Sequence, residues 1–358
     1  MDEHKKTELI FNALTKKRLF PHELEIRPSA NCNLKCIICD PRKQFLEGKN
    51  YVNRNKQLEL VTKETYERII KESANLGIST VGIGGGGEPF IRKDIIAIMK
   101  SIKEKGLYGR IVTNGTLLTK DIIKKMIQMQ WDCIIISING PNRQLDDLIR
   151  NRYNSFARSI NNIRKIVEMK KINQEILINY VICKYNQYRI LDFIKLVKKL
   201  KVNKISFNPI TVPKGYKKEF NLEITNKYKK YFRISMAFAL KNGIITNLDK
   251  LYDFYFEEEK NYNQLPICFE PLYKIAVQPN GNADPCPVVL KDAHREIKMN
   301  NIKYRTLKDI WNETYFKEFR KMLLMRKMPN KKYCRFCCGI IQTETNDIKE
   351  QLIKYYHL

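Results

Sequence analysis

Three cysteines near the start of the chain have the spacing of a metal-cluster site. Cys32, Cys36 and Cys39 follow one another as C-x3-C-x2-C, and three thiolates in this arrangement can bind three irons of a cubane 4Fe-4S cluster. Neither a fourth cysteine nor a histidine lies close by, whereas a structural zinc site needs four ligands. The fourth iron of such a cluster therefore has an open coordination position, at which a substrate or cofactor could bind.

Five more cysteines lie in the last quarter of the chain, around a hairpin signal at Pro279-Asn280-Gly281-Asn282. They are Cys268, Cys286, Cys334, Cys337 and Cys338. Their grouping predicts a second metal site. Sulfur ligation suits both iron–sulfur clusters and tetrahedral zinc, so a four-cysteine zinc ribbon is an alternative here. Cys133 and Cys183 stand alone in expected strands, and we expect both to be small buried core residues.

The composition limits the class of protein. The chain has 358 residues, of which 43% are apolar and 29% charged, and its formal net charge is +28. These values are typical of a globular protein of about two domains. No apolar run approaches the ~18 residues of a membrane span, and the charged N-terminus is not a secretory signal. We therefore expect a cytoplasmic protein with reduced thiols, whose charge favours acidic partners such as an acidic peptide, a phosphorylated metabolite or nucleic acid.

Short β-branched segments alternate with amphipathic segments in the first 210 residues. We expect strands at 23–29, 79–84, 108–113, 132–138, 175–183 and 204–208. The helical patterns between them lie at 63–74, 92–105, 119–130, 155–170 and 188–200. This alternation predicts βα units and a parallel sheet, but six units are too few for a closed eight-stranded barrel. The predicted fold is α/β, an open partial (β/α)6 barrel with its chemistry beyond the carboxyl ends of the strands.

The rest of the chain differs from this pattern. A polar, Lys-rich and aromatic-rich stretch carries one helical pattern at 226–242. After it come hairpin strands at 273–278 and 283–289 and an amphipathic helix at 306–325. We therefore predict five parts: an N-terminal segment 1–22, a barrel core 23–210, a bridging segment 211–265, a small α+β cluster-binding extension 266–340 and a C-terminal tail 341–358.

The cysteine loop and three later loops together resemble the radical S-adenosylmethionine (SAM) superfamily. Residues 84–89 read Gly-Gly-Gly-Gly-Glu-Pro after the second strand, residues 113–116 read Thr-Asn-Gly-Thr after the third, and residues 137–141 read Ser-Ile-Asn-Gly-Pro after the fourth. Each alone is an ordinary strand-to-loop transition, but four in order are specific. The resemblance covers roughly residues 20–340. It departs at Ile38, where the family usually has an aromatic residue, and at Asn139, where Asp is common.

The resemblance implies a set of SAM contacts. The Gly-Gly-Glu-Pro element would bind the methionine amino group, because its glycines let the backbone come close and Glu88 offers an acceptor for an ammonium. Ser137 and Asn139 would contact the carboxylate and the ribose, with Arg150 or Arg152 as the cationic partner of the carboxylate. The implied SAM-binding residues are Gly86, Gly87, Glu88, Pro89, Asn114, Ser137, Asn139 and Arg150.

The C-terminal cysteine set resembles the SPASM/Twitch extension of radical SAM enzymes, which carries auxiliary clusters. A two-cluster unit would need more cysteines than the five present, so one auxiliary 4Fe-4S cluster, the Twitch form, is expected. The implied ligands are Cys268, Cys286, Cys334 and Cys337, with Cys338 as the alternative to Cys337.

The resemblance also implies a reaction. SAM bound to the first cluster would be cleaved reductively to a 5′-deoxyadenosyl radical, which abstracts a substrate hydrogen atom. An auxiliary cluster favours a two-electron oxidation, with flavodoxin or ferredoxin as electron donor. The predicted substrate is a small molecule such as a sugar or cyclitol, or a peptide, with an acidic group compatible with the charge.

Two other functions stay open at this stage. One is a peptide maturase or an epimerase, in which Cys338 would be the hydrogen donor. The other is a basic zinc-bearing nucleic-acid-binding protein, which explains the charge and the cysteines but leaves the SAM motifs unexplained.

Overall fold

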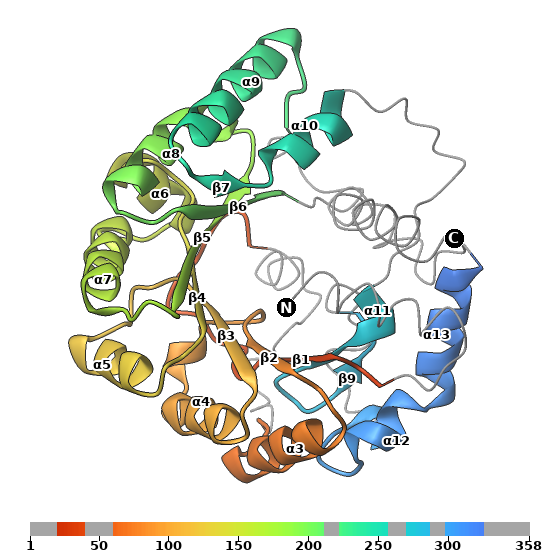
Figure 1. Cartoon of the computed structure of the whole chain (residues 1–358). Coiled ribbons are helices and arrows are strands. Elements are labelled where there is room, and N and C mark those ends of the chain that lie inside the picture. The colour runs from red at the N-terminus through yellow and green to blue at the C-terminus, as the bar shows by residue number, and fades with distance from the viewer. Residues whose placement is uncertain (1–19, 40–59, 211–221, 257–269, 287–297, 326–358) are drawn as a thin grey trace.

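One curved and largely parallel sheet organises the molecule. The computed structural model describes residues 20–39, 60–210, 222–256, 270–286 and 298–325. Within these ranges nine strands form a single sheet in the order β7-β6-β5-β4-β3-β2-β1-β8-β9, and Figure 1 shows it as an open arc. All neighbours are parallel except the antiparallel hairpin β8–β9. The strands are β1 (Glu23–Ile26), β2 (Thr80–Ile83), β3 (Tyr108–Thr113), β4 (Cys133–Ser137), β5 (Glu175–Ile182), β6 (Lys204–Pro209), β7 (Ile245–Thr246), β8 (Lys274–Val277) and β9 (Ala283–Asp284).

Helices cover the outer side of this arc (Figure 1). Along β5 every second residue is buried, and Tyr180 of this set packs against Phe193 of the covering helix, with ring centroids 4.3 Å apart. The intervening residues are only half-buried and face the inside of the arc. The helices are α3 (Lys63–Asn75), α4 (Ile95–Glu104), α5 (Lys120–Gln128), α6 (Arg143–Arg150), α7 (Ser155–Met169), α8 (Ile190–Lys199), α9 (Asn226–Lys241), α10 (Leu248–Phe256), α11 (Glu270–Tyr273), α12 (Leu307–Trp311) and α13 (Thr314–Leu324).

The expected α/β partial barrel is confirmed. All six expected strands and the five helices between them are present, with ends shifted by up to three residues. Thr62 and Thr119 cap α3 and α5, since each hydroxyl accepts a hydrogen bond from a backbone N–H in the first turn. Cys133 and Cys183 are buried core residues, as predicted. In the described part of the chain, no helix combines the length and apolar character that a membrane crossing requires.

The structure differs from expectation at both ends of the sheet. The bridging segment contributes a strand, β7, which extends the sheet beyond β6. The hairpin strand β8 pairs in parallel with β1, so the C-terminal extension continues the barrel sheet. The single helix expected at 306–325 is two helices, because the backbone of Asn312, with φ of −91° and ψ of 0°, leaves the helical conformation and ends α12.

Two parts of the sequence-based division remain untested. The predicted segments 1–22 and 341–358 lie wholly or largely outside the described residues, as does the second hairpin strand beyond residue 286. The five-part division therefore stays a prediction.

Candidate active site

The cysteine loop lies directly beyond the carboxyl end of β1. Cys32 is exposed, while Cys36 and Cys39 are partly buried. The loop backbone is fastened to the C-terminal end of α6, because Lys35 N donates to the Arg150 carbonyl at 3.3 Å and Ile37 N donates to the Ile149 carbonyl at 2.8 Å. Unpaired carbonyls at a helix end need such donors. Helix α6, which the sequence did not predict, therefore positions the three thiols.

The electrostatics of the thiols suit a positively charged ligand. The surrounding protein desolvates the Cys32 thiol, although part of the residue is open to solvent, and so raises its pKa. Burial, reinforced by the nearby Cys39, raises the pKa of Cys36 to about 12, and Arg150 opposes this rise. Iron binds the deprotonated form of cysteine. The positive charge of the iron would therefore offset the free-energy cost of deprotonating these desolvated thiols.

The three thiols belong to one loop that follows β1. No three Cys, His, Asp or Glu side chains converge on a common point within the described ranges. Their residue types, their single loop and their place at the strand ends nevertheless fit three ligands of a 4Fe-4S cluster.

The glycine-rich loop after β2 lies against the cysteine loop. Gly86 has a φ of +72°, and a Cβ there would be 2.9 Å from the Ser29 carbonyl. A Cβ at Gly87 would fall well inside van der Waals contact with the Asn31 carbonyl. That same carbonyl accepts a hydrogen bond from Glu88 N at 2.8 Å. Gly86 and Gly87 therefore let this loop pack directly on the backbone of the cysteine loop, and their predicted contact with SAM stays a prediction.

Glu88 turns its carboxylate into the protein. Its Oε1 accepts from Thr113 Oγ1 at 2.6 Å and from Phe90 N at 3.3 Å, and its Oε2 accepts from Asn114 N at 2.8 Å. Burial raises the pKa of Glu88, although these hydrogen bonds and Arg150 oppose the rise. Glu88 therefore ties the loop after β2 to the loop after β3. Its predicted contact with the SAM ammonium stays a prediction, as does any contact from Pro89, the buried residue that follows it.

Arg150 is also held inside the protein. Its side chain is 1% exposed, and its Nε lies 3.0 Å from Asp146 Oδ2. Its Nη1 donates to the Asn114 carbonyl at 3.2 Å and to Ser159 Oγ at 3.0 Å. Only Nη2 is buried without a hydrogen-bond partner in the part of the chain that the structure describes. The guanidinium thus stabilises the loops around the site, and its predicted contact with the SAM carboxylate stays a prediction.

The loop after β4 completes this edge of the sheet. Asn139 N donates to Asp146 Oδ1 at 2.6 Å, and Asn139 Oδ1 accepts from Val181 N at 3.0 Å. Ser137 is half-buried and pairs in register with Asn179 of β5. The predicted ribose and carboxylate contacts therefore lie on the same edge as the cysteine loop.

A charged inner wall was not predicted from the sequence. On β1 the apolar side chains of Leu24 and Ile26 enter the core, so alternate positions turn charged groups to the inside of the arc. The charged residues are Glu23, Glu25, Arg27, Arg110, Glu270 and Lys274. A parallel strand covered on both faces is usually continuously apolar. The alternation Glu-Leu-Glu-Ile-Arg at 23–27 is therefore the signal that could have revealed a polar interior.

These inner charges are paired with one another. Lys274 Nζ lies 2.5 Å from Glu270 Oε2 and 3.5 Å from Glu23 Oε1, and Arg110 also pairs with Glu23. Burial alone would lower the pKa of Lys274, but these carboxylates outweigh it and raise the pKa. The inside of the arc is therefore a polar, internally neutralised wall.

The turn of the β8–β9 hairpin lies at the same edge as the cysteine loop, whereas Cys286, which follows the antiparallel strand β9, lies toward the amino end of β1. Because β8 is parallel to β1, the carboxyl ends of both strands meet at the edge of the cysteine loop, and Arg27 N donates to the Val277 carbonyl at 2.9 Å. Pro279 Cγ would be 3.9 Å from a Cβ at Gly86. Cys286 itself is buried. The other predicted ligands of the second site, Cys268, Cys334, Cys337 and Cys338, lie outside the described residues.

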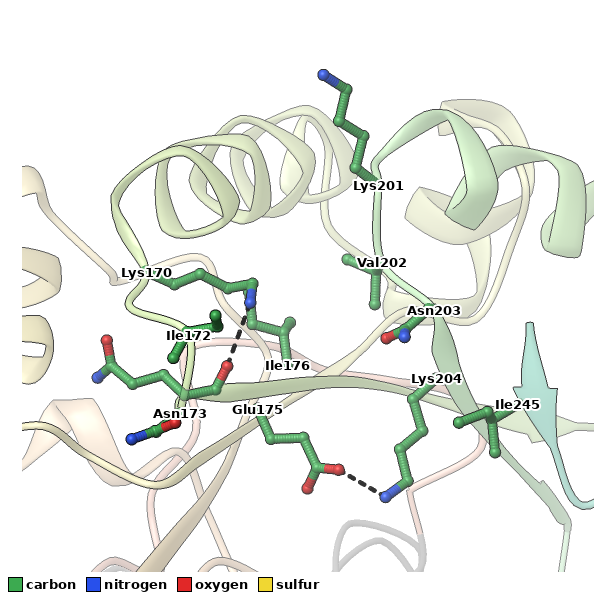
Figure 2. Close-up of a pocket in the computed structure, with 11 residues that line it drawn as sticks. Lys170, Ile172, Asn173, Glu175, Ile176, Lys201, Val202, Asn203, Lys204 and Ile245 are labelled. Atoms are coloured by element: carbon green, nitrogen blue, oxygen red, sulfur yellow. Dashed lines mark hydrogen bonds and ion pairs between the residues drawn. The ribbon is translucent and has the colours of Figure 1, made fainter. Parts of the chain in front are cut away.

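A separate pocket of about 350 Å³ opens at the opposite edge of the sheet (Figure 2). It is lined by the first residues of three parallel strands, Glu175, Lys204 and Ile245, and Glu175 pairs with Lys204 at 2.6 Å. Because the strands are parallel, this edge is remote from their carboxyl ends. The pocket is therefore not part of the candidate active site.

Known families and structures match this architecture. A model of the radical SAM superfamily matches residues 26–197, and a model described as an iron–sulfur cluster-binding domain, SPASM, matches residues 268–338. A probable GTP 3′,8-cyclase of Saccharolobus islandicus is 26% identical over 245 residues, which cover 64% of this chain and 74% of that protein.

Two solved structures are similar in fold. Streptococcus suis SuiB bound to S-adenosylmethionine is 18% identical with a TM-score of 0.68, covering 95% of this chain and 78% of that one. SuiB is also known in complex with its precursor peptide SuiA. Native anSMEcpe with bound AdoMet is 18% identical with a TM-score of 0.64, covering 94% and 96%. The chain thus belongs to the radical SAM superfamily, as an enzyme that binds SAM and a 4Fe-4S cluster and carries a C-terminal SPASM domain for auxiliary iron–sulfur binding.

Proposed function

We propose that the chain is a radical SAM oxidoreductase that carries out a two-electron oxidation with the help of one auxiliary 4Fe-4S cluster. When bound, the first cluster and SAM supply a 5′-deoxyadenosyl radical that removes a hydrogen atom from the substrate. The proposed ligands of the first cluster are Cys32, Cys36 and Cys39. The proposed ligands of the auxiliary cluster are Cys268, Cys286, Cys334 and Cys337.

One observation carries the oxidation. The β8–β9 hairpin that leads to Cys286 continues the barrel sheet beside β1, and its turn lies at the edge of the cysteine loop. Its turn at Pro279 also accepts a hydrogen bond from Val61 N at 3.0 Å, which fixes it against the barrel. A cluster held by Cys286 would therefore be attached to the barrel sheet itself, and we propose that it accepts the second electron of the oxidation.

The residues around the chamber have proposed roles in binding and orientation. The glycine cradle at Gly86 and Gly87 would receive the amino group of SAM, with Ser137 and Asn139 on the other side. Of the inner charges, Glu25 is half-buried and pairs with Arg27 near the cysteine-loop end of β1, so this pair would present polar groups to a substrate. We therefore propose a polar substrate, and a flavodoxin or ferredoxin as electron donor.

A peptide substrate is the second candidate. SuiB, whose fold is similar, is known with the precursor peptide SuiA, and the net charge of +28 suits an acidic peptide. A small polar molecule such as a cyclitol fits the polar wall equally well.

The test removes the auxiliary site and leaves the first cluster. The double variant Cys268→Ala, Cys286→Ala should lose about four of eight irons, retain slow SAM cleavage and fail to convert substrate. The matched control is Cys133→Ala, Cys183→Ala, which removes two buried thiols of the core and should retain iron and turnover. Substrates would be screened by mass spectrometry, following deuterium from substrate into 5′-deoxyadenosine.

Three outcomes would contradict the oxidation. Substrate turnover at the native rate in the double variant would make the second site structural. Zinc at that site would favour the ribbon interpretation. Loss of product from Cys338→Ala alone, with both clusters present, would identify a hydrogen donor and an epimerase.

A further inference from the structure

Asn114 holds a fixed orientation beside the first cysteine of the loop. It is the second residue of the Thr-Asn-Gly-Thr segment after β3 and is 9% exposed. Its side-chain Oδ1 accepts from Thr116 N at 2.9 Å and from Thr116 Oγ1 at 2.6 Å. Because two donors occupy Oδ1, the amide cannot flip without losing both bonds. The Nδ2 group must therefore face the cysteine loop.

The backbone of Asn114 is held just as firmly. Its N–H donates to Glu88 Oε2 at 2.8 Å, and its carbonyl accepts from Ser159 Oγ at 2.8 Å and from Arg150 Nη1 at 3.2 Å. The side-chain amide is thus attached to a backbone position that three buried side chains stabilise. This support keeps the side-chain amide of Asn114 in one position, so that even a long contact with the cysteine loop is maintained.

The Nδ2 group donates toward the cysteine loop in two directions. It lies 2.9 Å from Asn33 Oδ1 and 3.9 Å from Cys32 Sγ. Leu34 N also donates to Cys32 Sγ, at 3.4 Å. The described contacts include no N–H donor to the sulfur of Cys36, so Cys32 is distinguished from it by its donors.

We infer that Asn114 is a positioning residue that sets the reduction potential of the first cluster through Cys32. The inference rests on the proposed function, in that Cys32 must be a cluster ligand. An N–H that donates to a ligand sulfur stabilises the more negative, reduced state of an iron–sulfur cluster and so raises its potential. Because the distance from Nδ2 to the sulfur is long, we expect only a modest rise in the reduction potential. The cluster would then accept one electron from the reductant more easily.

The test replaces the donor and measures the potential. Asn114→Leu removes the donor without adding charge and decides the test. Asn114→Asp keeps the acceptor for Thr116 but adds a negative charge, which by itself makes the potential more negative. Each full-length variant would be titrated anaerobically with dithionite, following only the electron paramagnetic resonance signal that changes when SAM is added. We expect a reduction equilibrium two- to tenfold less favourable, which is about 18 to 59 mV more negative for a one-electron couple.

The matched control is Asn33→Ala. It removes the Asn33 bonds to Asn114 Nδ2 and to Thr116 Oγ1, the latter 2.8 Å long, but leaves Asn114 facing the sulfur. The potential of this control should equal that of the unmodified protein.

Several results would overturn the inference. They are an unchanged potential in Asn114→Leu, an equal shift in the Asn33 control, or loss of the cluster from both Asn114 variants with the fold intact. The last result would mean that Asn114 assembles the site without tuning it. Failure of the proposed function is distinct, because unmodified protein would then show no signal that responds to SAM.

Discussion

Replacement of Arg150 by methionine tests whether this residue acts on the fold or on SAM. The substitution breaks the ion pair with Asp146, in which the two side chains are 1% and 0% exposed. It also removes the hydrogen bonds to the Asn114 carbonyl and to Ser159 Oγ. Removing one partner of a buried pair costs about 3–5 kcal/mol. Asp146 keeps the hydrogen bond from Asn139 N, so we expect a loss of about 3 kcal/mol.

The double variant Arg150→Met, Asp146→Asn should recover much of this loss. Asn at position 146 keeps an acceptor for Asn139 N while removing the unpaired buried charge. We expect it to be more stable than Arg150→Met alone by about 1–2 kcal/mol, since neither charge is then left buried without a partner. An exposed pair, Arg189 with Asp192 at 3.2 Å, provides the control, and Arg189→Met should cost less than about 1 kcal/mol.

The assay is anaerobic thermal unfolding, together with SAM titration by calorimetry. One kcal/mol corresponds to a shift of about 2–4 °C in Tm for domains of this size class. An unchanged Tm in Arg150→Met with a large loss of SAM affinity, and no rescue by Asp146→Asn, would refute the structural role. Arg150 would then be the partner of the SAM carboxylate.

Three further substitutions test the loops around the site. Cys36→Ala should abolish SAM cleavage and leave the circular dichroism spectrum unchanged; continued production of 5′-deoxyadenosine would refute its assignment as a ligand. Glu88→Ala should weaken SAM binding about ten- to a hundredfold, because a charge-assisted hydrogen bond contributes about 1.5–3 kcal/mol, and should lower Tm because three internal donors lose their acceptor. A lower Tm with unaltered SAM affinity by calorimetry would restrict Glu88 to a structural role. Gly87→Ala should displace the cysteine loop, lower the iron content and reduce the free energy of unfolding by at least about 1–3 kcal/mol. Its control is Gly77→Ala, at a position with φ of +79° and no heavy atom within 4 Å of the added Cβ. The control should lose about 1–2 kcal/mol of stability and keep its iron. Equal iron content in these two variants would contradict the close approach at Gly87.

The sequence predicted the barrel well because its signals are local. The strands and helices predicted between 63 and 209 each have their own hydrophobic period and several have their own caps, so no distant contact was needed to identify them. Helix α6, in the same range, was missed although Asn142 caps it. It has only eight residues, and its buried face combines Ile149 with the ion pair of Asp146 and Arg150, so apolar spacing alone does not reveal that face.

The site was predicted less completely because its roles depend on which atoms face each other. Glu88 and Arg150 were expected to contact SAM, and the structure gives both of them internal partners first. The pairing of β8 with β1 joins residues at opposite ends of the chain, and no local pattern specifies such a partner. The inner charges follow from that pairing, since Lys274 reaches Glu23 across it.

The central place of β1 has a consequence for how the chain reaches its fold. β1 (Glu23–Ile26) lies between β2 and β8, and its second neighbour, β8 (Lys274–Val277), comes more than half the length of the chain later. Until β8 arrives, one side of β1 exposes unpaired backbone groups, directly before the loop that carries Cys32, Cys36 and Cys39. An open edge of this kind is a template for pairing with other chains, and closure over so long a separation is slow. Shortening the chain before residue 274 would make that exposed edge permanent and should favour aggregation.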